Sequence, residues 1–215
     1  MSASDVSRQI GDLIEVTNAI AKAYDSIKNL SSLPEAFQEV NKYLPLVGKT
    51  LQDAKSPAQR LQSADDDTMA LESLLYSCND KAGKLREIFQ QINEISEGRY
   101  DAFQYREIII GQDRQCVETL MDGILGDLRA LIAHNIFPAE MRRLVEPLEQ
   151  ARKELAGVSP SLADTDLADQ PRTASQYGNN NCQYNLFGKG IQKITGGHYF
   201  EAKGDQNFGT IPKAC

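Results

Sequence analysis

The stretch MALESLLYSCNDKAGKLREIFQQINEI, which spans residues 69–95, decides the fold class. Its apolar side chains recur at intervals of three and four residues, so they share one face of an α-helix. An acidic run over residues 65–67 suits the positive end of a helix dipole, and Gly98 is placed to end the helix. The pattern predicts an amphipathic helix between these signals, with the following apolar face: Met69, Leu71, Leu74, Leu75, Cys78, Ala82, Leu85, Ile88, Phe89, Ile92 and Ile95.

The same periodicity continues on both sides of this stretch. It predicts further helices over about residues 5–29, from 32 onward, over 100–110, from 117 to about 133, and over 138–155. Pro45 is expected to end or kink the second helix after Leu44, and Pro147 to kink the last one. Helices joined by mostly short connections favour a bundle. We therefore predict an all-α fold, a bundle of about six helices over residues 1–157.

Composition and charge limit the classes of function. The chain has 215 residues, of which 41% are hydrophobic and 25% charged, which suffices for a real core. No apolar run approaches the ~18 residues of a membrane-spanning helix, and the N-terminus lacks the features of a signal peptide, so a resting location in the cytoplasm is expected. The formal net charge of −7 argues against a nucleic-acid partner. Residues 172–215 are nevertheless net basic, so the two segments are expected to have different roles.

Residues that commonly carry chemistry are few and scattered. The four cysteines and two histidines lack metal-ligand spacing, so no metal site is predicted, and Cys78 and Cys116 are expected to be buried. The sequence contains neither a Gly-x-x-x-x-Gly-Lys-Ser/Thr phosphate loop nor a Gly-x-Ser-x-Gly nucleophile elbow. We predict that the protein is not an enzyme and needs no cofactor. An enzyme of unrecognised type would require a pocket with converging polar groups that the sequence does not indicate.

After the helices the texture changes. Residues 158–175 are small, polar and interrupted by proline, which is typical of a flexible linker. Residues 176–215 are rich in Gly, Asn, Gln and aromatics, and seven of the 15 glycines follow residue 171. Three interpretations stay open: a disordered polar tail, a small hairpin packed on the bundle, or a segment that stacks with other copies into a cross-β fibril.

In the fibril interpretation each residue type has a role. Asn and Gln side chains form ladders along the fibril, aromatic rings pack between layers, and glycines allow the turns. Gln183, Gln192 and Gln206 are the candidates for ladders, and Tyr184, Phe187, Tyr199, Phe200 and Phe208 are those for packing. Gly188, Gly190, Gly196, Gly197, Gly204 and Gly209 are the candidates for turns, and Asp205 lies in the same motif.

Both halves of the chain resemble known fungal segments. LPEAFQEVNKYLPLV (33–47), KAGKLREIF (81–89) and VETLMDGILGDL (117–128), in this order, resemble the SesA domain, a member of the HeLo-like group. That group occurs at the N-termini of fungal NACHT and other P-loop receptors and of their cell-death effectors. Residues 176–215 resemble the sigma amyloid motif that such effectors carry. The combination resembles an effector of heterokaryon incompatibility or fungal innate immunity.

The resemblance implies a mechanism and partners. A NACHT (NLR) receptor with a matching motif oligomerises on sensing a cue, and its motif templates residues 176–215 into prion-like amyloid. Clustering then refolds the helical domain, and its first helix attacks the plasma membrane and causes programmed cell death. The alternative is an adaptor, a helical module that clusters through its tail but never touches lipid.

The first helix carries the candidate membrane-active residues. They are its apolar positions Ile10, Leu13, Ile14, Ile20, Tyr24 and Ile27. The plain alternative is that these side chains form bundle core, and the two roles are not exclusive. Asp12 and Glu15 lie in the half expected to insert, and a central carboxylate costs of order 2.5–3.5 kcal/mol in a bilayer. Binding at the membrane interface, or a pore with a charged lining, is therefore expected rather than a single span.

Overall fold

A computed structural model describes residues 3–59, 66–96 and 98–162 of the chain. Within these ranges the fold is all-α, as the periodicity predicts, with six α-helices and one 3₁₀ helix. The elements in chain order are α1 (Ala3–Ile27), α2 (Glu35–Gln59), α3 (Asp66–Ile95), α4 (Ala102–Gly111), α5 (Val117–Ala133), η1 (Ala139–Leu144) and α6 (Val145–Ala156). The predicted linker and tail lie outside the described residues, apart from positions 158–162.

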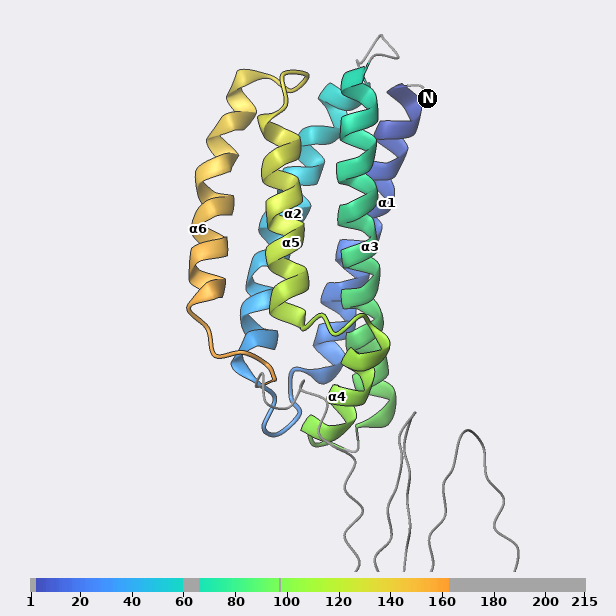
Figure 1. Cartoon of the computed structure of the whole chain (residues 1–215), viewed down its shortest axis with the longest axis vertical. Helices are drawn as coiled ribbons and strands as arrows, with labels where there is room; N and C mark the ends of the chain where they lie inside the picture. The colour runs from blue at the N-terminus through green and yellow to red at the C-terminus, as the bar shows by residue number, and fades with distance from the viewer. Residues whose placement is uncertain (1–2, 60–65, 97, 163–215) are drawn as a thin grey trace, which may run out of the picture. The chain divides into compact units, whose positions relative to one another are not determined.

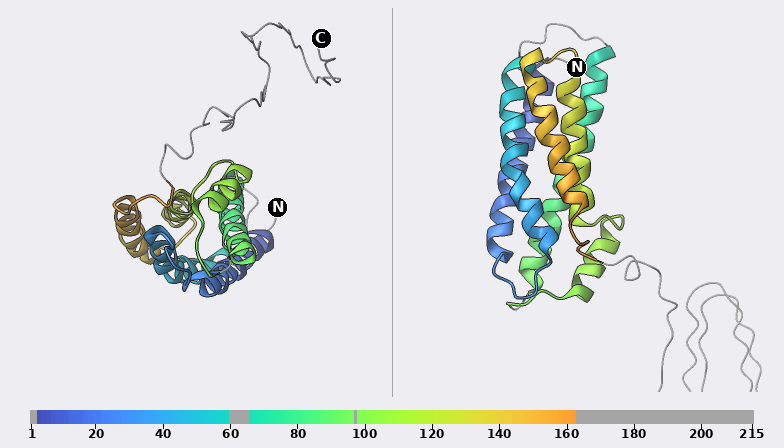
Figure 2. Two further views of the ribbon diagram at one scale, coloured as in Figure 1. Left: turned by 90° about the horizontal axis from the view of Figure 1, so that it is seen from below. Right: turned by 90° about the vertical axis from the view of Figure 1, so that its left-hand side faces the viewer.

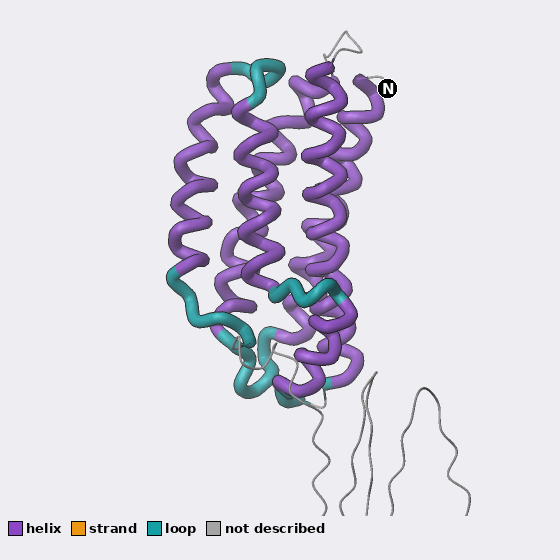
Figure 3. The backbone as a smooth tube through the Cα atoms, viewed as in Figure 1, coloured by secondary structure: helices purple, strands orange, loops and turns teal. Residues whose placement is uncertain are grey.

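Four long helices, α1, α2, α3 and α5, run side by side around the core (Figure 1). Helix α1 packs against α2 and α3, and α5 packs against the same two helices from the other side. Helix α6 lies beside α5 and α2, whereas the short α4 packs against α3 at one end of the bundle, as the view from below shows (Figure 2). The tube in Figure 3 shows loops gathered at the two ends of the helices, which is typical of an up-and-down bundle.

The core is made of the apolar faces that the sequence predicts, with differences at the edges. Leu71, Leu75 and Leu85 of α3 are at most 1% exposed. Met69 and Ile95, at the two ends of the same predicted face, are 68% and 40% exposed. The prediction was wrong for these two positions, because the helix period alone does not show where neighbouring helices stop covering the face.

Pro45 was expected to end or kink the second helix. The helix does not end there: α2 continues through Pro45 to Gln59. Pro45 is exposed, so its missing N–H and its ring affect the outer side of the helix, while Leu44 and Val47 stay packed in the core. In the last helical segment the break falls between the 3₁₀ helix and Val145. Pro147 lies in the first turn of α6, where an N–H has no partner within the helix, so the proline removes no hydrogen bond of the helix.

Two loops at the α4 end of the bundle are joined by backbone hydrogen bonds. The N–H of Ser31 donates to the Gly98 carbonyl at 3.3 Å, and the N–H of Tyr100 donates to the Ser31 carbonyl at 3.0 Å. Gly98 has a φ of +79°, a left-handed conformation that favours glycine and directs the chain out of α3. Asp101 then caps α4 by accepting the N–H of Phe103 at 2.8 Å. The α1–α2 and α3–α4 connections therefore form one corner.

Candidate functional site

The apolar residues predicted to act on membranes lie in the core of this state. Ile10, Leu13, Ile20 and Ile27 of α1 are at most 1% exposed, Tyr24 is 8% exposed, and Ile14 is partly buried against the same core. Their role as core residues is therefore established for the described structure. Their action on lipid requires another state and stays a prediction. Of the helices in the described part of the chain, none is both long and apolar enough to cross a membrane.

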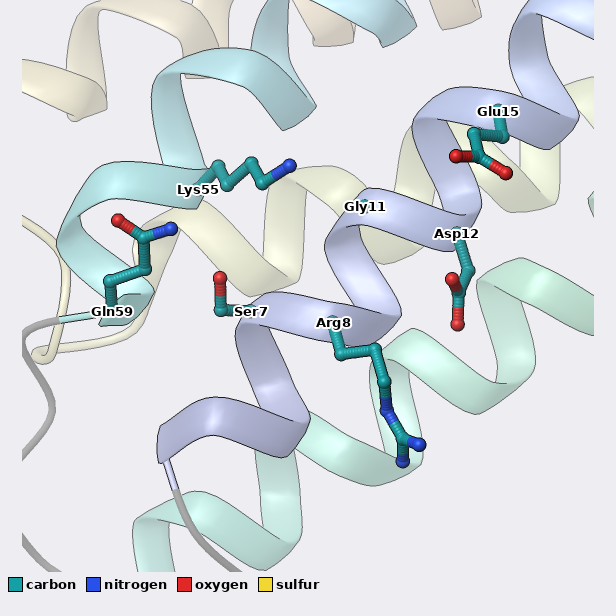
Figure 4. A pocket seen from close by; sticks show the side chains of 7 residues that line it. All are labelled: Ser7, Arg8, Gly11, Asp12, Glu15, Lys55 and Gln59. Atoms are coloured by element: carbon teal, nitrogen blue, oxygen red, sulfur yellow. The ribbon is translucent and has the colours of Figure 1, made fainter.

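The outward face of α1 is charged. Asp12 and Glu15 are exposed and, with Arg8 and Gly11, line an open depression of about 510 Å³ between α1 and the end of α2. Figure 4 shows Lys55 reaching from α2 across Gly11, where a Cβ would lie 3.5 Å from the lysine Nζ. The depression carries charges of both signs. Helix α1 is thus amphipathic in the folded state, with its apolar face fully used by the bundle.

Ion pairs link the long helices to different extents. Among the described residues, Arg8–Asp5 lies within α1, and Lys28–Asp25 joins α1 to the residue that follows its end. Ion pairs between different helices connect α2 with α6 (Lys42–Glu154), α3 with α5 (Lys81–Asp127) and α5 with α6 (Arg129–Glu149, Arg152–Asp122). In the described part of the chain, α1 packs on its neighbours through its apolar face, whereas α2, α3, α5 and α6 are also cross-linked by charge.

Helix α5 uses two glycines to receive these cross-links. Lys81 of α3 lies across Gly123, and its Nζ is 2.6 Å from both Asp127 Oδ2 and Ser77 Oγ. Arg152 of α6 lies across Gly126. A Cβ at Gly123 would be 2.7 Å from the Lys81 Cδ, so the absence of a side chain there lets the lysine cross the helix surface.

The arginine contact is bidentate. Arg152 Nε and one terminal nitrogen donate to the two Asp122 oxygens at 2.8 and 3.0 Å, and these bonds raise the pKa of the guanidinium. The sequence DGILGD (122–127) therefore places an aspartate beside each glycine, and α3 and α6 each bind α5 through an ion pair. The periodicity of this stretch predicts its helix but does not indicate that its glycines receive side chains from α3 and α6.

A buried polar cluster lies where the described chain ends. We call it the junction cluster; it consists of Tyr100, Tyr105, Glu118 and Ser161. Ser161 follows α6 and is 6% exposed. Its N–H donates to Glu118 Oε1 at 3.0 Å, its hydroxyl is 2.7 Å from Glu118 Oε2, and its carbonyl accepts from the Tyr100 hydroxyl at 3.4 Å. Three polar groups of one residue are thus bound, and its neighbour Leu162 is 4% exposed.

Hydrogen-bond chemistry fixes the direction of the chain of donors in this cluster. The Glu118 carboxylate only accepts, so the Ser161 hydroxyl donates to it. The Tyr105 hydroxyl, 2.8 Å from Ser161 Oγ, must then donate to the serine, and it accepts the Val117 N–H at 3.3 Å. Burial raises the pKa of Tyr105 well above its ordinary value and also raises that of Tyr100, which keeps both as donors. The first N–H of α5 is satisfied through this chain.

The two junction tyrosines also belong to an aromatic cluster that reaches α1. Phe37 of α2 lies 5.3 Å from the Tyr105 ring and 5.9 Å from the Tyr100 ring, measured between centroids. Phe37 is 5.5 Å from Phe89 of α3, which is 6.1 Å from Tyr24 of α1. Five packed rings therefore connect the junction cluster to the helix that carries the candidate membrane-active residues.

Sequence reasoning did not find the junction cluster. Ser161 falls in the segment predicted to be a linker, and only the apolar Leu162 beside it could have indicated packing. All the candidate amyloid residues, from Gln183 to Gly209, lie outside the described residues. Cys78 and Cys116 are buried, as predicted, and burial raises the pKa of the Cys78 thiol to about 12. His134 follows the last residue of α5. Among the described residues, no group of three or more His, Cys, Asp or Glu side chains is arranged to hold a metal ion.

Comparison with known proteins gives one match. The family model SesA, described as the N-terminal domain on NACHT NTPases and P-loop NTPases, matches residues 10–131, which is more than half of the chain. The matched range extends from the first buried turns of α1 nearly to the end of α5. No curated protein and no solved structure matches the chain significantly.

Proposed function

The chain belongs to the SesA family, and from this premise we propose that it is a non-enzymatic fungal cell-death effector activated by a NACHT-type receptor. In this proposal residues 176–215 receive the signal by joining an amyloid templated by the receptor. The helical bundle then executes the response at the plasma membrane, with α1 as the active element. The family's link to NACHT NTPases supports a partner of that kind.

The observation that carries the proposal is the place of the junction cluster. Residues 163–215 continue from Leu162, directly after Ser161, which is bound to α4 and α5 through Tyr105 and Glu118. A change in the segment after Leu162 therefore acts first on this cluster. From there the five packed rings lead to Tyr24 of α1. This is a physical route from a receiver segment to the helix that is proposed to act.

Energetics explain why such a helix needs an external driving force. Release of α1 exposes six fully or almost fully buried apolar side chains, from Val6 to Ile27. Each is worth about 1.5–3 kcal/mol, so release costs on the order of 10 kcal/mol. That is comparable with the whole stability of a domain, about 5–15 kcal/mol, so α1 stays bound in the resting state. Fibril assembly by many tails is a source of free energy large enough to shift this balance.

The pattern of charges supports α1 as the separable helix. The ion pairs between helices connect α2, α3, α5 and α6, so these four keep specific partners when α1 departs. The exposed Asp12 and Glu15 make a single span unfavourable. We therefore propose that released α1 binds at the membrane interface or lines a pore with its charged face.

A second function, a non-lytic adaptor, is favoured by the same two carboxylates. Leakage of dye from vesicles of phosphatidylcholine and phosphatidylserine separates the two. The effector proposal predicts leakage only after the full chain is seeded with fibrils of residues 176–215, and none from a variant with proline at Gly188, Gly196 and Gly204. The matched control replaces the same three glycines with alanine instead of proline. Fibrils that form without leakage would establish the adaptor and contradict the effector.

A further inference from the structure

The short helix α4 exposes apolar side chains that the bundle does not use. Tyr105 and Ile109 face inward and are fully buried, whereas Phe103 is 69% exposed and Ile110 is 38% exposed. The two exposed residues are seven positions apart and therefore lie on the same face, two turns from each other. Helix α4 thus has a second apolar stripe that points away from its own core.

Two opposite charges lie at the centre of this stripe. Arg106 and Glu107 occupy the positions three and four residues after Phe103, and Arg106 is 3.1 Å from Glu107 within the same chain. The Glu107 side chain is 57% exposed and the Arg106 side chain is 22% exposed. The order along the face is apolar, basic, acidic, apolar. This order is complementary to itself when a second helix of the same sequence runs in the opposite direction.

We propose that this face, Phe103, Arg106, Glu107 and Ile110, pairs antiparallel with the same face of a second copy of the chain. A two-fold axis then passes between positions 106 and 107. Phe103 of one copy packs on Ile110 of the other, and the two Arg–Glu pairs meet as a ring of four alternating charges. The contact is isologous, so it closes as a dimer.

The place of α4 explains when this contact forms. Tyr105 of α4 is bonded to Ser161, so the described part of the chain ends beside this helix. A ten-residue helix with two apolar side chains makes less contact than the roughly 1,200–2,000 Å² of a stable interface, so free copies stay monomeric. Tails gathered in a fibril hold the domains at effective concentrations of about the millimolar range, where a weak contact forms. This timing rests on the proposed function; the pairing geometry does not.

Disulfide trapping in the full chain tests the geometry. All variants carry serine at Cys182 and Cys215, while the buried Cys78 and Cys116 are kept. Phe103→Cys and Ile110→Cys are made on separate copies, one of them with an affinity tag, and mixed at high concentration under mild oxidation. Antiparallel pairing predicts that the mixture cross-links at least about fivefold more than either variant alone, because only position 103 faces position 110. Met69→Cys with Tyr76→Cys, an equally spaced exposed pair on α3, is the matched control and is expected to show no such preference.

A charge test asks whether the contact lies between copies. Arg106→Glu alone and Glu107→Arg alone place like charges across the axis, and each is expected to abolish dimer sedimentation at high concentration. Mixing the two variants places opposite charges across the axis and is expected to restore dimer sedimentation. A role of these residues within one chain would not explain that recovery. Equal trapping of the 103–110 and α3 pairs overturns the proposal. A Phe103→Ser/Ile110→Ser variant that loses vesicle binding but still sediments as a dimer at high concentration would also overturn it, in favour of a lipid contact.

The trapping and sedimentation experiments at high concentration use soluble, unseeded chain, so their results do not depend on amyloid. Trapping there supports the α4 contact, whereas a seeded full chain that forms no fibrils would count against the tail mechanism alone. Fibrils without the 103–110 cross-link would count against the contact alone.

Discussion

Removal of one hydroxyl at the junction cluster should loosen the end of the bundle where the tail begins. Tyr105→Phe deletes the group that donates to Ser161 at 2.8 Å and accepts the Val117 N–H at 3.3 Å. Both partners are buried, so the Val117 N–H is left without an acceptor. A buried donor in that position costs about 1–3 kcal/mol, and we expect the free energy of unfolding to fall by about 2 kcal/mol.

The matched control is Tyr43→Phe. Tyr43 is also nearly buried, and its hydroxyl donates to Glu154 Oε2 at 2.7 Å. Glu154 keeps Lys42, Gln150 and water when that hydroxyl is removed, so no buried group is left unsatisfied and the loss is a fraction of that at Tyr105.

Urea unfolding followed by helical circular dichroism measures both variants. Amide hydrogen exchange then locates the change. In Tyr105→Phe the exchange should rise over residues 158–162 and at the start of α5, with smaller increases in α1. In Tyr43→Phe it should rise near α6 alone. A Tyr105 variant that is no less stable than the Tyr43 variant, with residues 158–162 still protected, would refute the reasoning about the junction cluster.

Three further outcomes are expected. The hydrogen-bond partners of Glu154 hold the pKa of its carboxyl group at about 2, below the ordinary 4.5. The ionised carboxylate therefore stabilises the fold above pH 4.5, and this contribution disappears as the pH falls through about 2. Acid titration of stability should therefore be flatter in Glu154→Gln, and parallel curves would contradict this. The Cys78 thiol, with its pKa near 12, should resist iodoacetamide at about pH 8 until urea unfolds the domain, as peptide mass spectrometry can show; rapid labelling of folded protein would contradict its burial. Gly126→Ala should raise stability by about 0.5–1 kcal/mol through helix propensity, since its Cβ would meet Arg152 no closer than 3.7 Å. Gly123→Ala should raise the stability less, because the new Cβ displaces Lys81. A higher melting temperature for Gly123→Ala than for Gly126→Ala would contradict that account.

The sequence was sufficient for the parts of the fold that depend on local periodicity. The apolar spacing of residues 69–95 and of the neighbouring stretches predicts six helices with bounds close to those observed. That the helix continues past Pro45 could not be predicted, because the cost of an interior proline depends on which side of the helix faces water, and this is a tertiary property. Met69 was misplaced for the same kind of reason.

The junction cluster could not be predicted, because it joins residues far apart in sequence. Ser161 meets Glu118 and Tyr105 across 43 and 56 positions, and each of these residue types is common on surfaces. The roles of Gly123 and Gly126 could not be predicted either, since a glycine in a helix has the same local pattern whether it is exposed or crossed by a long side chain. Contacts of this kind follow from packing and not from periodicity.

The most direct test of the effector account is hydrogen exchange of the full chain, measured by mass spectrometry before and after seeding with fibrils of residues 176–215. The account predicts that residues 176–215 gain protection while residues 158–162 and α1 lose it. Helix α5 keeps its protection between Asp122 and Asp127, which are bound by Arg152 and Lys81. Protected tails combined with an α1 that exchanges as slowly as before would contradict the proposed route from tail to helix.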